Sequence, residues 1–151
     1  YGYTVVAVGK DSAETGFFNV QKPVHEMGDA NIINLMNQTS ISETWHLIND
    51  AAAVVTMDSG ILHLAGTTNT DIVELGSPIN PDFRRPWREE GKHIYVRGAC
   101  GLHCSSNMKY ALEYWPTIDY VQPLIGCLEK KESFECHPSV AQVMHAINDN
   151  I

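Results

Sequence analysis

The sequence predicts an α/β fold: a Rossmann-like parallel sheet with flanking helices. Short apolar or β-branched runs recur along the chain and alternate with helical patterns or long connections. This alternation is typical of βαβ units. The chain has 151 residues, of which 44% are hydrophobic, and it contains no internal repeat. A chain of this size and composition is long enough to bury one core.

Five runs have the composition of strands. The first consists mainly of β-branched and aromatic residues and is closed by Gly9, so we expect it to be buried. The third, "AAVVTM", is apolar throughout, which is typical of a strand covered on both faces. The predicted strands are residues 3–8, 31–36, 52–57, 71–75 and 93–97.

Three segments have helical patterns. Ser40 is followed three residues later by Glu43, the sequence of a capping box, and predicts a helix over 41–51. "GILHLAGTT" (60–68) predicts a short helix. "PSVAQVMHAIND" (138–149) predicts an amphipathic helix with Pro138 near its first position. Residues 9–30 contain glycines and a proline and are expected to be mainly loop.

The net charge and hydropathy of the chain limit the classes of binding partner and the cellular location that we expect. The net charge is −8, and the ten Lys and Arg residues are scattered, so no basic stripe for nucleic acid is present. No apolar run approaches the roughly 20 residues that a transmembrane helix needs. No basic segment followed by an apolar one opens the sequence, so we expect a cytoplasmic protein without a transmembrane segment.

The stretch "MDSGILHLAG" (57–66) lies where a predicted strand gives way to a helix. In open parallel sheets, ligands bind at the carboxyl ends of the strands. Gly60 has no Cβ and lets a ligand approach the backbone, and the amides that start a helix suit a phosphate. His63, one turn on, is placed to reach the same phosphate, and the Asp58 carboxylate suits sugar hydroxyls.

Each of these residues also has an ordinary structural interpretation. Asp or Ser before a helix most often caps the helix, so Asp58 and Ser59 fit that role as well. A histidine such as His63 in an apolar helix is more often a core residue than a ligand. The residue types leave both interpretations open.

The stretch from Ser40 to Pro81 resembles the carboxyl-terminal domain of glycosyltransferase family 9, the ADP-heptose–lipopolysaccharide heptosyltransferases. That family has a D-[ST]-G-x-x-H-L-A motif after a helix and a strand, and then a strand ending in G-x-[ST]-x-P. The similarity covers most of residues 1–151. The matching residues are Asp58, Ser59, Gly60, His63, Leu64, Ala65, Gly76, Ser77, Pro78 and Pro81.

The resemblance implies one half of a two-domain GT-B fold that binds a nucleotide diphosphate sugar such as ADP-heptose. The amides of Ser59 and Gly60 and the side chain of His63 would hold the donor diphosphate, and Asp58 would face the donor sugar. No divalent metal is implied for the transfer step. By the same resemblance, Lys10 and Asp11 lie by the ribose, with Asp11 the more suitable hydroxyl partner, and Gln38 and Thr39 lie by the nucleobase.

The resemblance also implies parts that precede Tyr1: the first strand of this domain and an amino-terminal half. In the family that half supplies the acceptor site and the general base, so we expect the acceptor glycan or protein to bind there. No catalytic base is expected within this chain, which alone would be inactive. The chain departs from the family over residues 66–74, where Glu74 lies inside a predicted strand.

All four cysteines lie in one segment, with the spacing C-x3-C-x22-C-x8-C. Cys100, Cys104, Cys127 and Cys136 are compatible with a tetrahedral zinc or iron site, and such a site can order a segment with few apolar anchors. Two disulfides and four reduced thiols are the alternatives, and nothing in the sequence indicates an oxidising compartment. His103 and His137 are candidate substitute ligands or surface residues.

Three arginines follow the fourth predicted strand, on the same rim as Asp58. Arg84, Arg85 and Arg88 suit a phosphate or an acidic acceptor, or else are solvated loop charges. We expect a nucleotide-sugar-binding domain over 1–97, a cysteine-containing segment over 98–137, and a carboxyl-terminal helix over 138–151 that packs on the same domain.

The predicted function is donor binding in a heptosyltransferase-like inverting glycosyltransferase. Two alternatives remain open. One is a non-catalytic nucleotide-sugar-binding or assembly module with a structural metal site. The other is a different GT-B-like enzyme, such as a sugar-nucleotide epimerase.

Overall fold

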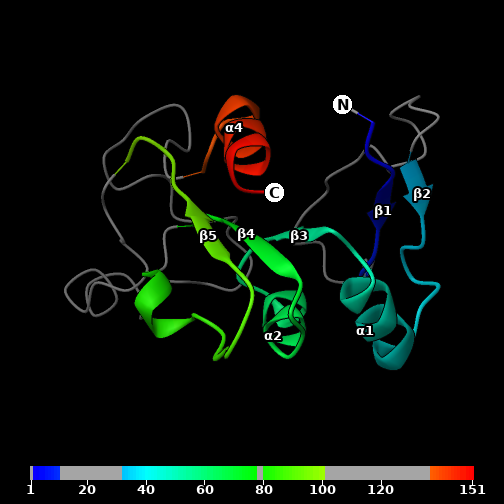
Figure 1. Cartoon of the computed structure of the whole chain (residues 1–151). Coiled ribbons are helices and arrows are strands. Elements are labelled where there is room, and N and C mark those ends of the chain that lie inside the picture. Colours follow the sequence, from blue (N-terminus) through cyan, green and yellow to red (C-terminus); the bar gives the residue numbers. More distant parts are fainter. Residues whose placement is uncertain (1, 11–31, 78–79, 101–136) are drawn as a thin grey trace, which may run out of the picture. The chain divides into compact units, whose positions relative to one another are not determined.

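The computed structural model describes residues 2–10, 32–77, 80–100 and 137–151 (Figure 1). The chain consists of two compact units, Tyr1–Leu47 and Ile48–Ile151. Each unit contains a parallel sheet, and helices flank the strands. This is the α/β, Rossmann-like arrangement that the sequence predicts. The three-part division at residues 97 and 137 stays a prediction, because residues 101–136 lie outside the described part of the chain.

In the first unit, β1 (Val5–Ala7) and β2 (Ile32–Asn34) pair in parallel. The pairing continues beyond the strands, since the amide of Asn37 donates to the Gly9 carbonyl at 2.8 Å. Both strands lie within the predicted ranges. The expectation that residues 3–8 are buried is wrong: Val5 is 51% exposed and Val6 is 40% exposed. β1 pairs only with β2 and is only three residues long, so its side chains have few neighbours in this sheet.

The helix α1 (Ile41–Asn49) begins with the predicted capping box. The Glu43 carboxylate accepts from the Ser40 amide at 2.8 Å and from the Ser40 hydroxyl at 2.7 Å. In return, the Glu43 amide donates to the Ser40 hydroxyl oxygen at 3.3 Å. These contacts satisfy donors that a helix start otherwise leaves open, so the expected start of this helix is confirmed.

The second unit is built on three parallel strands in the order β3-β4-β5. They are β3 (Ala53–Thr56), β4 (Asp71–Leu75) and β5 (His93–Val96). β4 matches its predicted bounds, and the other two lie within theirs. Thr56 on β3 is the register partner of Glu74 on β4, and Glu74 is in turn the partner of Tyr95 on β5.

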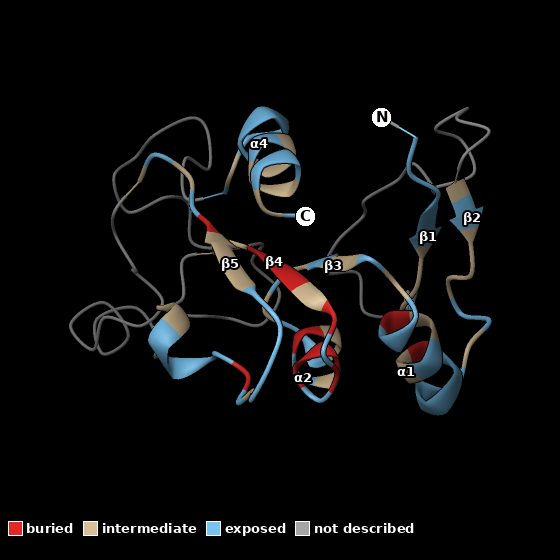
Figure 2. Ribbon diagram, viewed as in Figure 1, coloured by how far each residue is buried: buried red, intermediate tan, exposed pale blue. Residues whose placement is uncertain are grey.

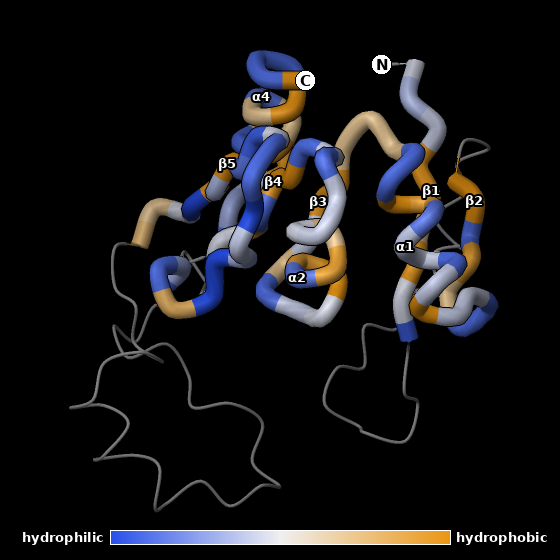
Figure 3. The backbone as a smooth tube through the Cα atoms, turned by 60° about the horizontal axis from the view of Figure 1, so that its bottom comes forward, coloured by the Kyte–Doolittle hydropathy of each residue, from blue (hydrophilic) through white to orange (hydrophobic). Residues whose placement is uncertain are grey.

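Burial differs between neighbouring strands of this sheet (Figure 2). Ile72, Val73 and Glu74 of β4 are buried, because β4 is the central strand. β3 is hydrophobic in Figure 3, yet Val55 is 46% exposed. The expectation that residues 52–57 are covered on both faces is therefore wrong. Within this sheet β3 has a neighbour on one side only.

Helices lie on both faces of β4 and β5 (Figure 1). α2 (Gly60–Gly66) covers one face, where Leu62 and Ala65 pack with Ile72 and Ile48 in the core. This short helix is two residues shorter than predicted, because Thr67 caps its carboxyl end. Burial of its apolar face supplies the stability that so short a helix lacks alone.

α4 (Val140–Asn150) lies on the other face. Its start differs slightly from the prediction. Ser139 is the N-cap and forms a second capping box with Gln142, so Pro138 precedes the cap and does not occupy the first turn. No helix in the described part of the chain is both long and apolar enough to cross a membrane.

The loop between β4 and β5 contains a short 3-10 helix, η2 (Pro81–Phe83), and is anchored at several points. Pro86 is buried, and a Cβ at Gly66 of α2 would overlap its ring. The Arg88 guanidinium donates to the carbonyls of Thr70 at 2.8 Å and Glu90 at 2.9 Å. These contacts fix the second half of the loop beside the carboxyl end of α2 and the start of β4.

Candidate functional site at the carboxyl edge of the second sheet

The "DSG" stretch lies where the sequence predicts it, directly after the carboxyl end of β3. β3 ends at Thr56, and α2 begins at Gly60, so Asp58 and Ser59 form the connection. Because β3, β4 and β5 are parallel, their carboxyl ends share this edge. In open α/β sheets this is the edge at which ligands bind.

The start of α2 is not closed by a side chain. Ser59 occupies the N-cap position with extended backbone, but its hydroxyl makes no capping hydrogen bond. That hydroxyl lies 3.2 Å from the Thr56 hydroxyl instead. A Cβ built on Gly60 would meet no atom of the described residues within 4 Å. The interpretation of Ser59 as a side-chain cap is therefore wrong, and the space beside the first turn is open.

His63 lies on the outer face of the same helix and is exposed. Its neighbours Leu62 and Ala65 are the residues that face the core, both at 0% exposure. The interpretation of His63 as a core residue is therefore wrong. An exposed imidazole one turn into the helix is accessible to a ligand at this edge.

Asp58 is half-buried and pairs with an arginine of the loop. Its Oδ2 lies 3.6 Å from Nε of Arg84, and the two side chains are 13% and 52% exposed. Nε of Arg85 lies 4.0 Å from Oδ1 of Asp82, in a pair that is mostly solvated. Solvated pairs contribute little stability. Arg84 and Arg85 are thus available at the surface. The expectation that Arg88 lies on the same rim as Asp58 is wrong, because its guanidinium binds the Thr70 carbonyl directly before the start of β4.

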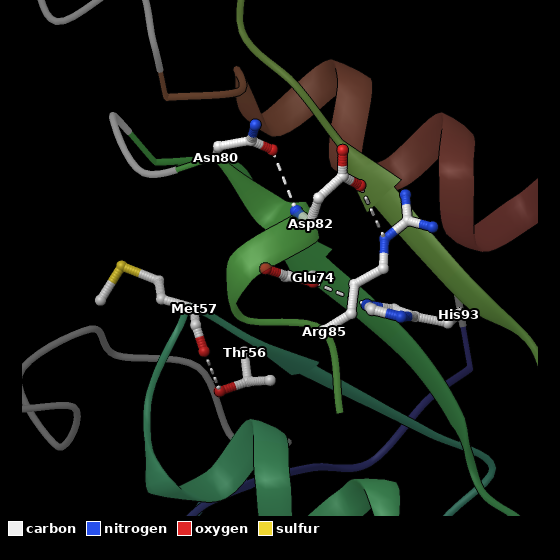
Figure 4. A network of polar contacts seen from close by, with 7 residues as sticks. All are labelled: Thr56, Met57, Glu74, Asn80, Asp82, Arg85 and His93. Atoms are coloured by element: carbon white, nitrogen blue, oxygen red, sulfur yellow. Dashed lines mark hydrogen bonds and ion pairs between the residues drawn. The ribbon is translucent and has the colours of Figure 1, made fainter. Parts of the chain in front are cut away.

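A buried pair that was not predicted from the sequence joins Glu74, near the carboxyl end of β4, to His93, the first residue of β5. Oε2 of Glu74 lies 2.6 Å from Nε2 of His93, with side chains that are 3% and 14% exposed. Figure 4 shows these side chains pointing toward one another, with Arg85 beside them. Burial raises the pKa of the Glu74 carboxyl, and His93 opposes that rise. The available signal was Glu74 in the interior of the strand "DIVEL", but its partner on β5 was not predictable from that signal.

The residues predicted to lie by the nucleoside belong to the first unit. Lys10 follows β1, and the Thr39 hydroxyl bonds to the Thr44 hydroxyl at 2.9 Å. The Gln38 side-chain Nε2 donates to the Asn34 backbone carbonyl at 2.9 Å. Asp11 lies outside the described residues. The nucleoside-binding roles of these residues stay predictions.

Most of the cysteine segment also lies outside the described residues. Cys104, Cys127, Cys136 and His103 are among the undescribed positions, whereas Cys100 is described and carries a free thiol. Within the described ranges, no group of three or more His, Cys, Asp or Glu side chains is arranged to hold a metal ion. The predicted zinc or iron site stays a prediction.

Comparison with known proteins agrees with the motif. The sequence model described as glycosyltransferase family 9 (heptosyltransferase) matches residues 1–112. Over 104 residues the chain is 31% identical to lipooligosaccharide heptosyltransferase 2 of Haemophilus influenzae, covering 64% of this chain and 30% of that protein. It is 30% identical over 102 residues to lipopolysaccharide heptosyltransferase 2 of Escherichia coli K12, covering 68% and 29%.

The matches cover only part of each relative. The chain spans about three tenths of the length of the curated relatives it matches. No solved structure matches it significantly.

Proposed function

This chain belongs to glycosyltransferase family 9, and from that premise we propose that it forms the donor-binding half of a heptosyltransferase-like inverting glycosyltransferase. The donor is a nucleotide diphosphate sugar of the ADP-heptose type. The observation that carries the proposal is the open start of α2, which follows the carboxyl end of β3 and contains the family motif.

The first turn of α2 binds the donor diphosphate in this proposal. The amides of Ser59 and Gly60 point toward it with the positive end of the helix dipole, and His63 adds a side-chain donor. The same groups stabilise the negative charge that develops on the leaving diphosphate during transfer. Asp58 accepts hydrogen bonds from the donor sugar, and its contact with Arg84 orients the carboxylate.

The remaining roles complete the donor site. Lys10 and Asp11 bind the ribose, and Gln38 and Thr39 lie by the nucleobase. The acceptor glycan or protein and the general base belong to an amino-terminal half, so this chain contributes no catalytic base. Transfer needs no divalent metal, since the helix amides and His63 neutralise the diphosphate.

A panel of nucleotide sugars tests the proposal. Thermal unfolding of the purified protein is measured with ADP-, GDP- and UDP-sugars, with free sugars and nucleosides as controls that lack the diphosphate. A ligand at 100 times its Kd stabilises the folded state by about 2.7 kcal/mol, so one nucleotide sugar is expected to raise Tm by several degrees. Equal Tm values for all nucleotide sugars and controls would contradict donor binding.

Product analysis separates the alternatives. A transferase, assayed with its amino-terminal half and an acceptor, releases the nucleoside diphosphate and extends the acceptor. An epimerase changes the sugar and leaves the nucleotide sugar intact. A binding or assembly module stabilises on nucleotide sugar but leaves it unchanged.

We also propose a structural metal in the cysteine segment, on the spacing of Cys100, Cys104, Cys127 and Cys136. Four thiolates hold zinc or iron in a closed tetrahedral site, which leaves no open position for catalysis. Elemental analysis with thiol titration tests this. About one equivalent of metal is expected, and less than about 0.2 equivalents together with four titratable thiols would contradict it.

A further inference from the structure

Glu74 is an acid in a position that suits an apolar residue. It is 2% exposed on the central strand, next to the buried Ile72 and Val73. Its Oε2 forms a hydrogen bond with Nε2 of His93, 2.6 Å away on β5. Burying a carboxylate is costly, and replacing a buried ionic pair by apolar residues of similar volume often stabilises a protein. Folding alone therefore does not explain this pair.

The position of Glu74 connects it to the donor edge. Its register partner on β3 is Thr56, whose hydroxyl lies 3.2 Å from that of Ser59. Neighbouring strands are about 4.8 Å apart, so Glu74 lies beside the strand end from which Asp58 and Ser59 continue. The charges of Asp58 and Arg85 both act on the Glu74 carboxyl.

We propose that Glu74 and His93 form a titratable pair that sets the charge of this edge, so that donor diphosphate binding weakens when the pair loses its proton. This inference rests on the proposed function, and it concerns how pH regulates donor binding at the same site. With one shared proton the pair is neutral overall, and without it the pair carries one negative charge beside an anion-binding site. By linkage, donor binding holds the proton on the pair.

Besides His93, two charged groups act on the Glu74 carboxyl. Asp58 disfavours a negative charge on Glu74, and Arg85 favours it. The His145 and Asp149 side chains of α4 bind one another at 3.2 Å and are well exposed. Asp58 precedes α2 and Arg85 follows η2. The other titratable groups on the neighbouring elements are His63 on α2, Tyr95 on β5, and His145 and Asp149 on α4.

Glu74→Gln removes the titrating carboxyl and keeps its shape, and Asp149→Asn is the matched control in an exposed His–carboxylate pair. Affinities for ADP-glucose and UDP-glucose are measured by calorimetry from about pH 5 to about 9. Their diphosphates are esterified at both ends and keep a constant charge in this range. A unit charge near the site is expected to change affinity about threefold to tenfold.

Wild-type affinity is expected to fall across one step as pH rises, and Asp149→Asn to follow it. Glu74→Gln is expected to show no step and to bind more tightly than wild type at the alkaline end. His93→Gln keeps the Glu74 carboxyl beside a neutral partner, so the step in donor affinity is expected to move to another pH. If Glu74→Gln does not fold, His93→Gln is measured in its place. Parallel profiles for wild type and the folded variants would overturn the inference alone. Absence of binding at every pH would overturn the proposed function and the inference with it.

Discussion

In the described part of the chain, three α-helices begin after a serine, but the three serines have different roles. Ser40 of α1 and Ser139 of α4 each form a reciprocal capping box, with Glu43 and Gln142 respectively. Ser59 of α2 makes no capping bond. The two boxes close the first turn of their helices with side chains, whereas α2 leaves its first turn open at the carboxyl edge of the sheet.

The difference arises at the third helical position. A capping box needs Glu or Gln there, and α2 has Leu62, which is fully buried in the core. The sequence uses that position for packing, so the helix is held by its apolar face and not by its cap. A helix without a side-chain cap can thus be stable when tertiary packing holds it, and its first amides then stay available for a ligand.

The largest expected effect comes from covering the open turn. Gly60→Val places a branched side chain beside the helix amides, where a Cβ meets no other atom within 4 Å. We expect donor affinity to fall by at least about 100-fold, or about 2.8 kcal/mol. The free energy of unfolding is expected to change by less than about 1 kcal/mol, because the core is untouched. Calorimetry and urea unfolding check both values, and unchanged affinity would remove the anion-site argument.

Gly66→Ala, at the other end of α2, is expected to lower stability and to leave donor affinity nearly unchanged. Its Cβ would overlap the buried Pro86, so overpacking is expected to lower the free energy of unfolding by about 1–3 kcal/mol. The folded protein keeps its first turn open and is expected to bind the donor with nearly wild-type affinity. Urea unfolding and calorimetry on the same preparation measure the two quantities. Equal stability loss in both glycine variants would mean that the two ends of α2 do not differ as described.

Replacing each serine by alanine measures how much its side chain contributes to stability. Ser40→Ala removes a capping bond and is expected to lower the free energy of unfolding by about 1 kcal/mol. Ser59→Ala removes no capping bond and is expected to cost less than about 0.5 kcal/mol. Thermal and urea unfolding of the two variants, with Ser139→Ala as a second capped example, provide the test. A cost at Ser59 as large as that at Ser40 would show that α2 is capped in solution.

The smallest expected effects concern two carboxylates whose pKa values shift in opposite directions. Hydrogen bonds from Ser40 lower the pKa of Glu43, so its contribution to stability is lost as pH falls through the folded-state value. Burial raises the pKa of Glu74, so its contribution is lost as pH rises through the folded-state value. Urea unfolding across pH is expected to show Glu43→Gln diverging from wild type as pH falls, and Glu74→Gln diverging from wild type as pH rises above the unfolded-state pKa of a glutamate. The same sign for both would contradict these assignments.

Much of the fold was predictable because local patterns determine it. The bounds of β4 and the capping box at Ser40 follow from residue types at short spacing. Burial of the strands was less predictable, since the order of strands in a sheet is not contained in local composition. Residues 52–57 are more apolar than 71–75, yet β4 is central and β3 half-exposed.

The candidate site also has parts that local sequence predicts and parts that depend on tertiary structure. The motif located the junction at Asp58, Ser59 and Gly60, because family motifs and strand–helix order are both local signals. Whether Ser59 caps its helix depends on the direction of its hydroxyl, and that is fixed by Thr56 on β3. The Glu74–His93 pair depends on strand register across 19 residues of sequence, so the acid was noticed but its partner was not.

Amide chemical shifts test the central claim most directly. In a two-dimensional amide NMR titration with the nucleotide sugar that raises Tm most, the largest shifts are expected at Ser59, Gly60 and Ile61, where the open turn of α2 meets the diphosphate. The amides of Ser40 and Glu43, which already donate to side chains, are expected to stay unchanged. Saturable binding that leaves the Ser59–Ile61 amides in place and shifts residues elsewhere would contradict the account.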